Sequence, residues 1–301
     1  MTVPPQMYAI VGPTASGKSD LALALARRIG GEILSVDSMQ VYRGMNVGTA
    51  KPRDVEQRDV RHHLIDVVDP DQPFTAARFV EMADAAIAGS RARNVPLIAV
   101  GGTPLYFKVL FEGMFEGPGA DESLRERLRA LSNEELHRRV SEADPAAGAR
   151  IHVNDTKRLV RALEVIELTG KPISSLQTEW ASPTPRHEAK WVGLSWEREA
   201  LNRRINARVK AMLAAGWADE VRGLLARFGT LSKTASEATG YAELIAHVQG
   251  KLSLDDAIEQ IKIATRQLAR RQMKWFKRFP GVTWVAGDRP LDENLAAVLR
   301  P

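Results

Sequence analysis

Residues 12–19 read Gly12-Pro13-Thr14-Ala15-Ser16-Gly17-Lys18-Ser19, directly after the short apolar run of residues 7–11. They match the pattern G-x-x-x-x-G-K-[ST] in full, and residues 18–29 continue with apolar positions at helical spacing. Glycines let the backbone turn its N–H groups toward a phosphate, and the helix N-terminus adds a positive dipole end. We therefore predict that this P-loop binds a diphosphate or triphosphate, with Lys18 neutralising charge and Ser19 able to ligate Mg²⁺.

Further strand-like and helical segments follow in alternation. Apolar runs at residues 33–36 and 96–100 end in Asp37 and in Gly101-Gly102-Thr103, and residues 79–92 have the pattern of a helix. This alternation predicts an α/β fold of the P-loop NTPase type, a parallel sheet flanked by helices. Since ligands of such sheets bind beyond the carboxyl ends of the strands, three loops should converge on one crevice.

The middle of the chain has a different character. Charged helical stretches run through residues 121–142 and 154–169, and we predict a helical insertion domain at residues 117–189. The core would then comprise residues 1–116 and 190–301. Its second part contains strand-like residues 191–196 and 282–285 and helical residues 197–215, 217–228 and 253–279.

The amino-acid composition limits the possible partners and the cellular compartment of the protein. Lys and Arg exceed Asp and Glu by 42 to 37, a net charge of +5, which favours a polyanionic partner without naming it. The absence of cysteine excludes disulfides and thiolate metal sites. No apolar run is long enough to span a membrane, so a cytoplasmic protein is expected, and we expect a monomer.

Asp37 has two interpretations from its position alone. Its carboxylate could ligate metal or act as a base in the crevice, or it could cap a turn. The strand at residues 96–100 ends without an acidic residue, unlike a Walker B strand, which disfavours a motor-type ATPase. Gly101-Gly102-Thr103 permits close backbone approach to a ligand, with the Thr103 hydroxyl beside it, although a plain tight turn also fits. His62 and His63 are adjacent and so project apart; we interpret them as structural or as cleft-edge residues.

The helix at residues 253–279 combines an apolar stripe with a basic face. The stripe, predicted to be buried, is Leu254, Ile258, Ile261, Leu268, Trp275 and Phe279. The basic face is Lys262, Arg266, Arg270, Lys274 and Lys277, with Arg271 and Arg278 close by, and is either solvated or bound to phosphates. Lys157, Arg158 and Arg161 cluster in the insertion, and Trp180, Trp275 and Phe276 are either core residues or platforms for bases.

Together these segments resemble the tRNA dimethylallyltransferases. The resemblance rests on seven stretches: residues 12–19, Asp37 to Arg43, Gly48-Thr49-Ala50-Lys51-Pro52, His63-Leu64-Ile65-Asp66, Gly101-Gly102-Thr103, Lys157 to Val165 and Thr265 to Phe276. It implies transfer of a dimethylallyl group from dimethylallyl diphosphate to the exocyclic 6-amino group of the adenosine 3′ of the anticodon. The tRNAs would be those reading codons that begin with U, and the products N6-(dimethylallyl)adenosine and diphosphate.

The resemblance also implies residue roles. The P-loop would hold the diphosphate with Lys18 and Arg208, Ser19 would hold Mg²⁺, Asp37 would be the general base, and Thr103 would help to place the adenine. The anticodon stem-loop would contact Asp37, Ser38, Met39, Gln40, Thr103, Arg125, Lys157, Arg158, Leu159, Val160, Arg161, Arg270 and Arg271. Departures from the family pattern are Glu237, Lys274 and Pro104. The alternatives are a small-molecule kinase similar to adenylate or gluconate kinase and a non-catalytic RNA-binding P-loop module.

Overall fold

The computed structural model describes residues 6–115, 117–177 and 184–300. It divides into two compact units, Met1–Leu110 with His187–Pro301, and Phe111–Arg186. In the described part of the chain no helix is both long and apolar enough to cross a membrane.

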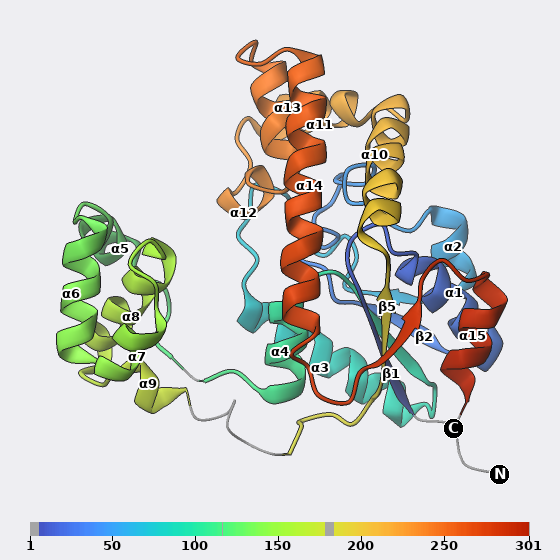
Figure 1. Ribbon diagram of the computed structural model, residues 1–301, viewed down its shortest axis with the longest axis horizontal. Coiled ribbons are helices and arrows are strands. Elements are labelled where there is room, and N and C mark those ends of the chain that lie inside the picture. Colours follow the sequence, from blue (N-terminus) through green and yellow to red (C-terminus); the bar gives the residue numbers. More distant parts are fainter. Residues whose placement is uncertain (1–5, 116, 178–183, 301) are drawn as a thin grey trace. The chain divides into compact units, whose positions relative to one another are not determined.

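The first unit is built on one sheet of six parallel strands in the order β3-β2-β4-β1-β5-β6 (Figure 1). The strands are β1 (Met7–Val11), β2 (Glu32–Ser35), β3 (His62–His63), β4 (Leu97–Val100), β5 (Lys190–Ser195) and β6 (Thr283–Ala286). Val100 at the end of β4 is in register with Ile10 of β1 and Ser35 of β2. The three strands therefore end side by side, as the alternation of strands and helices predicts.

Helices cover the sheet and extend beyond it. Those of the first unit are α1 (Lys18–Ile29), α2 (Asp54–Asp59), α3 (Ala76–Ala92), α4 (Pro104–Glu112), α10 (Arg198–Ala214), α11 (Trp217–Phe228), α12 (Lys233–Ser236), α13 (Tyr241–Val248), α14 (Leu254–Phe276) and α15 (Leu291–Leu299). The strands read as nearly continuous apolar runs because both faces of the sheet are covered. Ile10, Leu34 and Ile98 are fully buried in this core. In Figure 1, α10, α11, α13 and α14 stand together above the sheet.

The second unit is a small helical bundle. It contains α5 (Glu122–Arg129), α6 (Asn133–Ala143), α7 (Pro145–Arg150), α8 (Thr156–Thr169) and α9 (Ile173–Leu176). Side-chain caps start four of these helices, for example Asp121 on Leu124 N and Ser132 on Glu135 N. Its apolar core includes Leu136, Val140 and Leu159.

Two details differ from the sequence prediction. His62 and His63 form the edge strand β3, a length too short for a recognisable apolar pattern. The buried stripe of α14 is Ala257, Ile261, Ala269, Gln272 and Phe276, whereas Leu254 is 40% exposed. The predicted stripe was therefore wrong in part: Ile261 is buried, and Ile258, Leu268, Trp275 and Phe279 are only partly buried. Small residues such as Ala257 and Ala269 let α14 pack closely on its neighbours, and a search for large apolar residues passes over them.

Candidate active site

The P-loop is held by side chains that bind its carbonyl oxygens. Arg204 donates to Ala15 O at 2.9 Å, and Trp196 donates to Ser16 O at 3.0 Å. Ala15 and Gly17 have positive φ, 63° and 88°, which turns the backbone sharply. Among the described residues no acceptor is found for the backbone N–H groups of Ala15, Gly17 and Lys18. These N–H groups are therefore available to an anion.

Two cations lie in the same cleft as the loop. Burial, and after it the neighbouring Arg208, lower the pKa of Lys18 to about 8, while Asp37 opposes the shift. Burial likewise lowers the pKa of the Arg208 guanidinium, against the attraction of Asp37 and Asp20. Cations that are partly desolvated and repel each other are stabilised when an anion binds between them. This arrangement favours a diphosphate in the cleft.

Asp37 lies two residues after the end of β2. It both caps a turn and faces the cleft. Its Oδ1 accepts from Met39 N at 2.9 Å and Gln40 N at 3.4 Å, so the turn-cap interpretation is confirmed. Its Oδ2 lies 3.8 Å from the point where a Cβ on Gly102 would be. One oxygen thus fixes the carboxylate while the other lies toward the loop that follows β4, where it can accept a proton.

Thr103 joins the loops that follow β2 and β4. Its Oγ1 accepts from Ser38 N at 2.9 Å and lies 3.2 Å from Ser38 Oγ. A Cβ on Gly101 would lie 2.0 Å from Val36 O, so this close approach of the two loops requires glycine. The Thr103 hydroxyl therefore holds the segment that carries Asp37.

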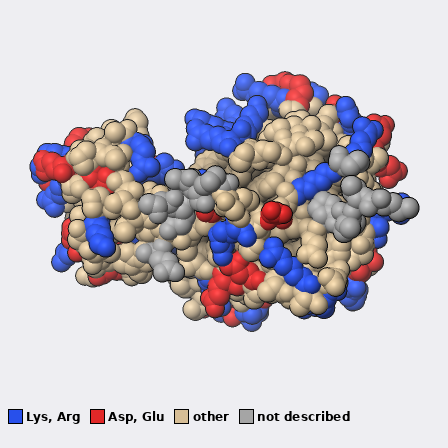
Figure 2. All heavy atoms as spheres, turned by 90° about the horizontal axis from the view of Figure 1, so that it is seen from below, with Lys and Arg blue, Asp and Glu red and all other residues tan. Residues whose placement is uncertain are grey.

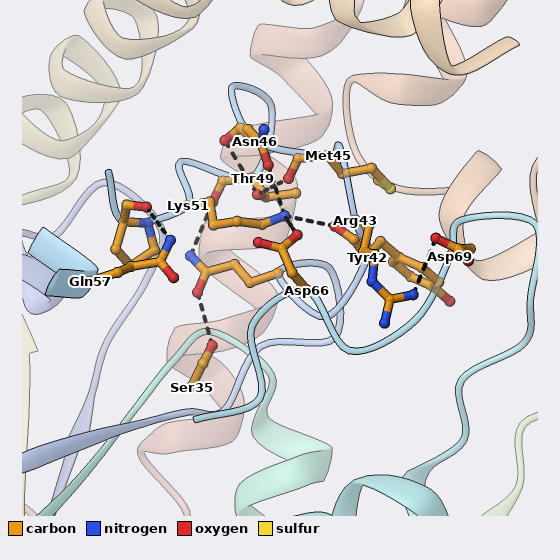
Figure 3. A network of polar contacts seen from close by, with 12 residues as sticks. Ser35, Tyr42, Arg43, Met45, Asn46, Thr49, Lys51, Gln57, Asp66 and Asp69 are labelled. Atoms are coloured by element: carbon orange, nitrogen blue, oxygen red, sulfur yellow. Dashed lines mark hydrogen bonds and ion pairs between the residues drawn. The ribbon is translucent and has the colours of Figure 1, made fainter. Parts of the chain in front are cut away.

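A buried lysine organises the loop that follows this segment (Figure 3). The Lys51 side chain is 3% exposed and donates to Tyr42 O, Asn46 Oδ1 and Asp66 Oδ1 at 2.7, 2.9 and 2.6 Å. All three hydrogens of the ammonium group are thus used, as a buried charge requires. Gln40 ties the same loop to β2, since it donates to Thr49 O at 3.3 Å and accepts from Ser35 Oγ at 2.9 Å.

Trp217 and Tyr241 form an aromatic wall beside this loop. A Cβ on Gly48 would lie 2.1 Å from Trp217 Nε1, and one on Gly240 would lie 2.0 Å from the same indole ring. Trp217 is therefore held between two glycines, and it packs edge-on against Tyr241 at 5.7 Å. Glu220 accepts from the backbone N–H groups of Asn46 and Val47 at 2.8 and 2.7 Å. The wall and the loop thus form one hydrogen-bonded assembly.

These elements surround a cleft of about 640 Å³, within the range of small-molecule sites. Of the predicted residues it is lined by Thr14, Ala15, Ser16, Gly17, Lys18, Ser19, Asp37, Ser38, Met39, Gln40, Thr103 and Arg208. Gly12 and Pro13, the first two residues of the loop, are buried. The described residues contain no cluster of three or more His, Cys, Asp or Glu that could hold a metal by itself. A metal here would need oxygens from the ligand as well as Ser19.

Other predicted contact residues are not among those that line the cleft. Arg125 and Lys157 to Arg161 belong to the second unit, and Arg270 and Arg271 are exposed on α14. Leu159 and Val160 are 0% and 4% exposed and their side chains pack in the bundle core, so a tRNA contact at these two positions stays a prediction and would have to involve their backbone. Phe276 is likewise a core residue, and Trp180 lies outside the described residues.

His62 and His63 lie at the edge of the sheet, and His62 also lines the cleft, so both predicted interpretations apply to it. His62 Nδ1 bonds Val60 O and His63 Nε2 bonds Glu32 Oε2, both at 2.7 Å. Sequence reasoning missed the roles of Lys51, Trp217 and Glu220. The signals were weak, a lysine inside a loop of small residues and a glutamate one helical turn after a tryptophan.

Comparison with known proteins decides the family. The family model described as IPP transferase matches residues 40–279. The chain belongs to the IPP transferase family. It is 47% identical to the tRNA dimethylallyltransferase of Geobacter metallireducens over 98% of this chain and 96% of that protein. The crystal structure of the full-length tRNA isopentenylpyrophosphate transferase of Bacillus halodurans is 37% identical, with a TM-score of 0.72 over 97% of this chain and 93% of its own.

A more distant solved structure has a similar fold. It is a eukaryotic dimethylallyltransferase acting on tRNA, 28% identical, with a TM-score of 0.81 over 94% of this chain and 74% of that one. Family membership makes this chain an enzyme, a prenyltransferase, and sets aside the small-molecule kinase and the non-catalytic binding module.

Proposed function

We propose that this protein transfers a dimethylallyl group from dimethylallyl diphosphate to the 6-amino group of adenosine in tRNA. The observation that carries the proposal is the meeting of an anion-binding loop and the Asp37 carboxylate in one cleft. The 6-amino group of adenine is a weak nucleophile, because its lone pair is delocalised into the ring. A base beside it and a stabilised leaving group are therefore the two things the reaction needs.

The step is a displacement at the allylic carbon. The adenine nitrogen forms a bond to C1 of the prenyl group as the bond from C1 to the diphosphate oxygen breaks. Asp37 takes the proton that the amino group loses. The diphosphate departs with the bonding electrons onto the P-loop N–H groups, Lys18 and Arg208, which lie in the same cleft. The loop would thus act as a leaving-group clamp.

Mg²⁺ fits the residues present. Ser19 lines the cleft directly after Lys18, and a hydroxyl together with phosphate oxygens and water suits a hard cation. When bound, the ion would neutralise charge on the diphosphate. Ser19 would hold it, while Lys18 and Arg208 bind the remaining phosphate charge.

The tRNA substrate explains the basic residues outside the cleft. We propose that Arg270 and Arg271 on α14, and Arg125, Lys157, Arg158 and Arg161 in the second unit, contact the anticodon stem-loop. On the face seen in Figure 2, Lys and Arg gather in several patches between acidic residues. The target would be the adenosine 3′ of the anticodon in tRNAs reading codons that begin with U. Unstacking a base in a loop requires only about a few kcal/mol, so such a base can reach Asp37.

The test is incubation of purified protein with labelled dimethylallyl diphosphate, Mg²⁺ and an unmodified tRNA transcript. Label should enter the tRNA, and nucleoside analysis should find N6-(dimethylallyl)adenosine beside the anticodon. Asp37→Ala should bind the tRNA as the parent does yet lose at least about 100-fold in turnover, as expected for a lost general base. Folded protein that leaves the tRNA unlabelled would overturn the proposal.

A further inference from the structure

Gln272 lies where three parts of the cleft meet. It is 5% exposed, sits on the buried face of α14 and lines the cleft. Its Oε1 accepts from Thr14 N of the P-loop at 2.8 Å. Its Nε2 donates to Gly102 O of the Gly-Gly-Thr loop at 2.6 Å. One side-chain amide therefore links the loop that follows β1 to the loop that follows β4.

The second of these loops is the one next to Asp37. A Cβ on Gly102 would lie 2.7 Å from Gln272 Nε2 and 3.8 Å from Asp37 Oδ2. Gly102 thus lies between the amide and the carboxylate, and a larger residue there would have to displace the Gln272 amide. Gln272 therefore connects the P-loop, the predicted diphosphate site, to the loop beside Asp37.

The rest of α14 supports this position. Ala269 and Ala15 of the P-loop belong to one apolar cluster, and Phe276 lies edge-on to Phe107 of α4 at 5.7 Å. Residues 269, 272 and 276 share one helix face, so a single rigid helix supports the P-loop, the amide bridge and the helix that follows Thr103. Arg270 and Arg271 are exposed on the same helical turn.

The amide of Gln272 satisfies both loops because it has an acceptor and a donor at the right length. A glutamate can accept from Thr14 N but, when ionised, has no hydrogen for Gly102 O. A methionine offers neither bond, and an asparagine is one methylene too short to reach both. Buried polar groups that lose their partner are costly, so the loops would shift to recover hydrogen bonds.

We propose that Gln272 is a positioning residue that sets the spacing between the departing diphosphate and the incoming adenine. The inference rests on the proposed prenyl transfer. Because the residue touches neither reacting group in this role, it should affect the rate of the chemical step far more than it affects binding of either substrate. A misplacement of about 1 Å between reacting groups costs about 100-fold in rate.

The test compares the full-length parent with Gln272→Glu, Gln272→Met and Gln272→Asn. Single-turnover rates are measured at saturating dimethylallyl diphosphate and tRNA, with separate titrations for the affinity of each substrate. We expect Gln272→Met and Gln272→Asn to lose about 10- to 100-fold in single-turnover rate. The tRNA dissociation constant should change by less than about threefold, since the exposed arginines stay in place.

The glutamate variant gives a signature that a packing role would not. A protonated carboxyl has the shape of the amide and can donate to Gly102 O, so the rate of Gln272→Glu relative to the parent should rise as the pH falls from about 8 toward the carboxyl pKa. Lys18, Asp37 and Arg208 face the same cleft, and a variant without a carboxyl at position 272 controls for their contribution. The same ratio for Gln272→Met should stay flat.

The outcomes separate the two proposals. If the parent itself transfers no label, the proposed function fails. If the parent is active and Gln272→Met keeps its single-turnover rate, the positioning role is overturned. Should the methionine variant fail to fold, the pH ratio of Gln272→Glu decides alone, and a flat ratio refutes the inference.

Discussion

The Tyr241 hydroxyl donates to Glu220 Oε1 at 2.6 Å, which joins α13 to α11 beside the cleft. The same carboxylate accepts from the backbone N–H groups of Asn46, Val47 and Gly48. One side chain thus serves four donors, three of them in the loop whose residues 48–50 line the cleft. Burial, and next the charge of Glu220, raise the pKa of the Tyr241 phenol well above its ordinary value, so this hydroxyl stays a donor.

Removal of this carboxylate should loosen the cleft wall. Glu220→Ala leaves four donors without their acceptor, and we expect a loss of about 3 kcal/mol in the free energy of unfolding. Tyr241→Phe removes one neutral donor and should cost about 1 kcal/mol. Urea denaturation of both variants beside the parent measures the difference. Equal stability of the two variants would mean that the backbone N–H groups of the loop gain nothing from Glu220.

We expect Lys18 to lower the free energy of unfolding but to strengthen binding of the diphosphate ligand. Its pKa is lowered to about 8, below the ordinary value of about 10.4 in an unfolded chain, so folding is penalised whenever the ammonium must stay charged in the empty cleft. That penalty is full below pH 8 and disappears as pH rises from 8 to about 10.4. Lys18→Met should therefore melt at or above the parent's temperature at pH 7, with the difference shrinking toward pH 10.

Replacement of the same lysine should weaken ligand binding. Loss of the ammonium should weaken binding of dimethylallyl diphosphate by at least about tenfold, as expected for a charge-assisted contact. In the parent, affinity for this ligand should decline as pH rises above 8, because the empty site loses its proton there. Calorimetric titration at pH 7 and pH 9 checks both statements. A parent affinity that is constant over this range would contradict the role of Lys18 as an anion-binding cation.

Local patterns predict the central part of the fold well. The P-loop, its strand and its helix follow from a short stretch of chain, and Asp37 and Gly101-Gly102-Thr103 could be placed at the same sheet edge because parallel strands end together. The edge strand β3 could not be found, since its two histidines are defined by pairing with Ile33 and Leu34. The stripe of α14 was misjudged because its buried face uses alanine and a glutamine rather than large apolar residues.

The supporting residues of the site depend on distant partners. Glu220 meets loop residues 172 to 174 positions earlier in the chain, and Gln272 meets Thr14 across 258 positions. No local periodicity predicts such pairs, because each end taken alone is an ordinary polar residue on a helix. The burial of Leu159 and Val160 was hidden for a related reason, since basic neighbours on the same turn indicate a charged surface.

Thr103 should act through the turn that carries Asp37. Thr103→Val keeps the shape of the side chain but leaves Ser38 N without its acceptor, so the carboxylate should lose its fixed position. We expect turnover to fall by about 10- to 100-fold while affinity for dimethylallyl diphosphate is unchanged. Thr103→Ser retains the hydroxyl and serves as the matched control, with near-parental turnover. A valine variant as active as the serine variant would refute this role.

Binding of tRNA should depend on salt in proportion to the number of phosphates that the protein neutralises. Each neutralised phosphate adds about 0.7 to 0.9 to the slope of log affinity against log salt. The double variant Arg270→Ala, Arg271→Ala should reduce this slope by about 1 for each phosphate that is no longer bound. Arg27→Ala, Arg28→Ala removes the same charge from the exposed last turn of α1 and is the control. Equal slopes for the two double variants would exclude α14 as a phosphate-binding face.

Glu164 should control the stability of the second unit. The carboxylate is 0% exposed and binds Arg125 at 2.8 Å, Arg161 at 2.6 Å and Asp121 N at 2.9 Å. Burial works against the charge, yet these hydrogen bonds outweigh it and hold the pKa of Glu164 below its ordinary value. Glu164→Gln should cost about 2 kcal/mol, less than for a fully buried pair because both arginines are partly exposed.

The lowered pKa of Glu164 sets the sign of its effect on stability as the pH changes. Because the folded pKa is depressed, the stabilising effect is present above the unfolded value of about 4.3 and is lost as pH falls through the folded pKa. Hydrogen exchange of α5 and α8 in the full chain, measured at pH 7 and near pH 4, should show protection falling in the parent and less so in Glu164→Gln. Glu142→Gln, whose exposed partner is Arg138, is the control and should change protection little. If both variants exchange alike at pH 7, the arginines that we propose for tRNA contact are held by something other than Glu164.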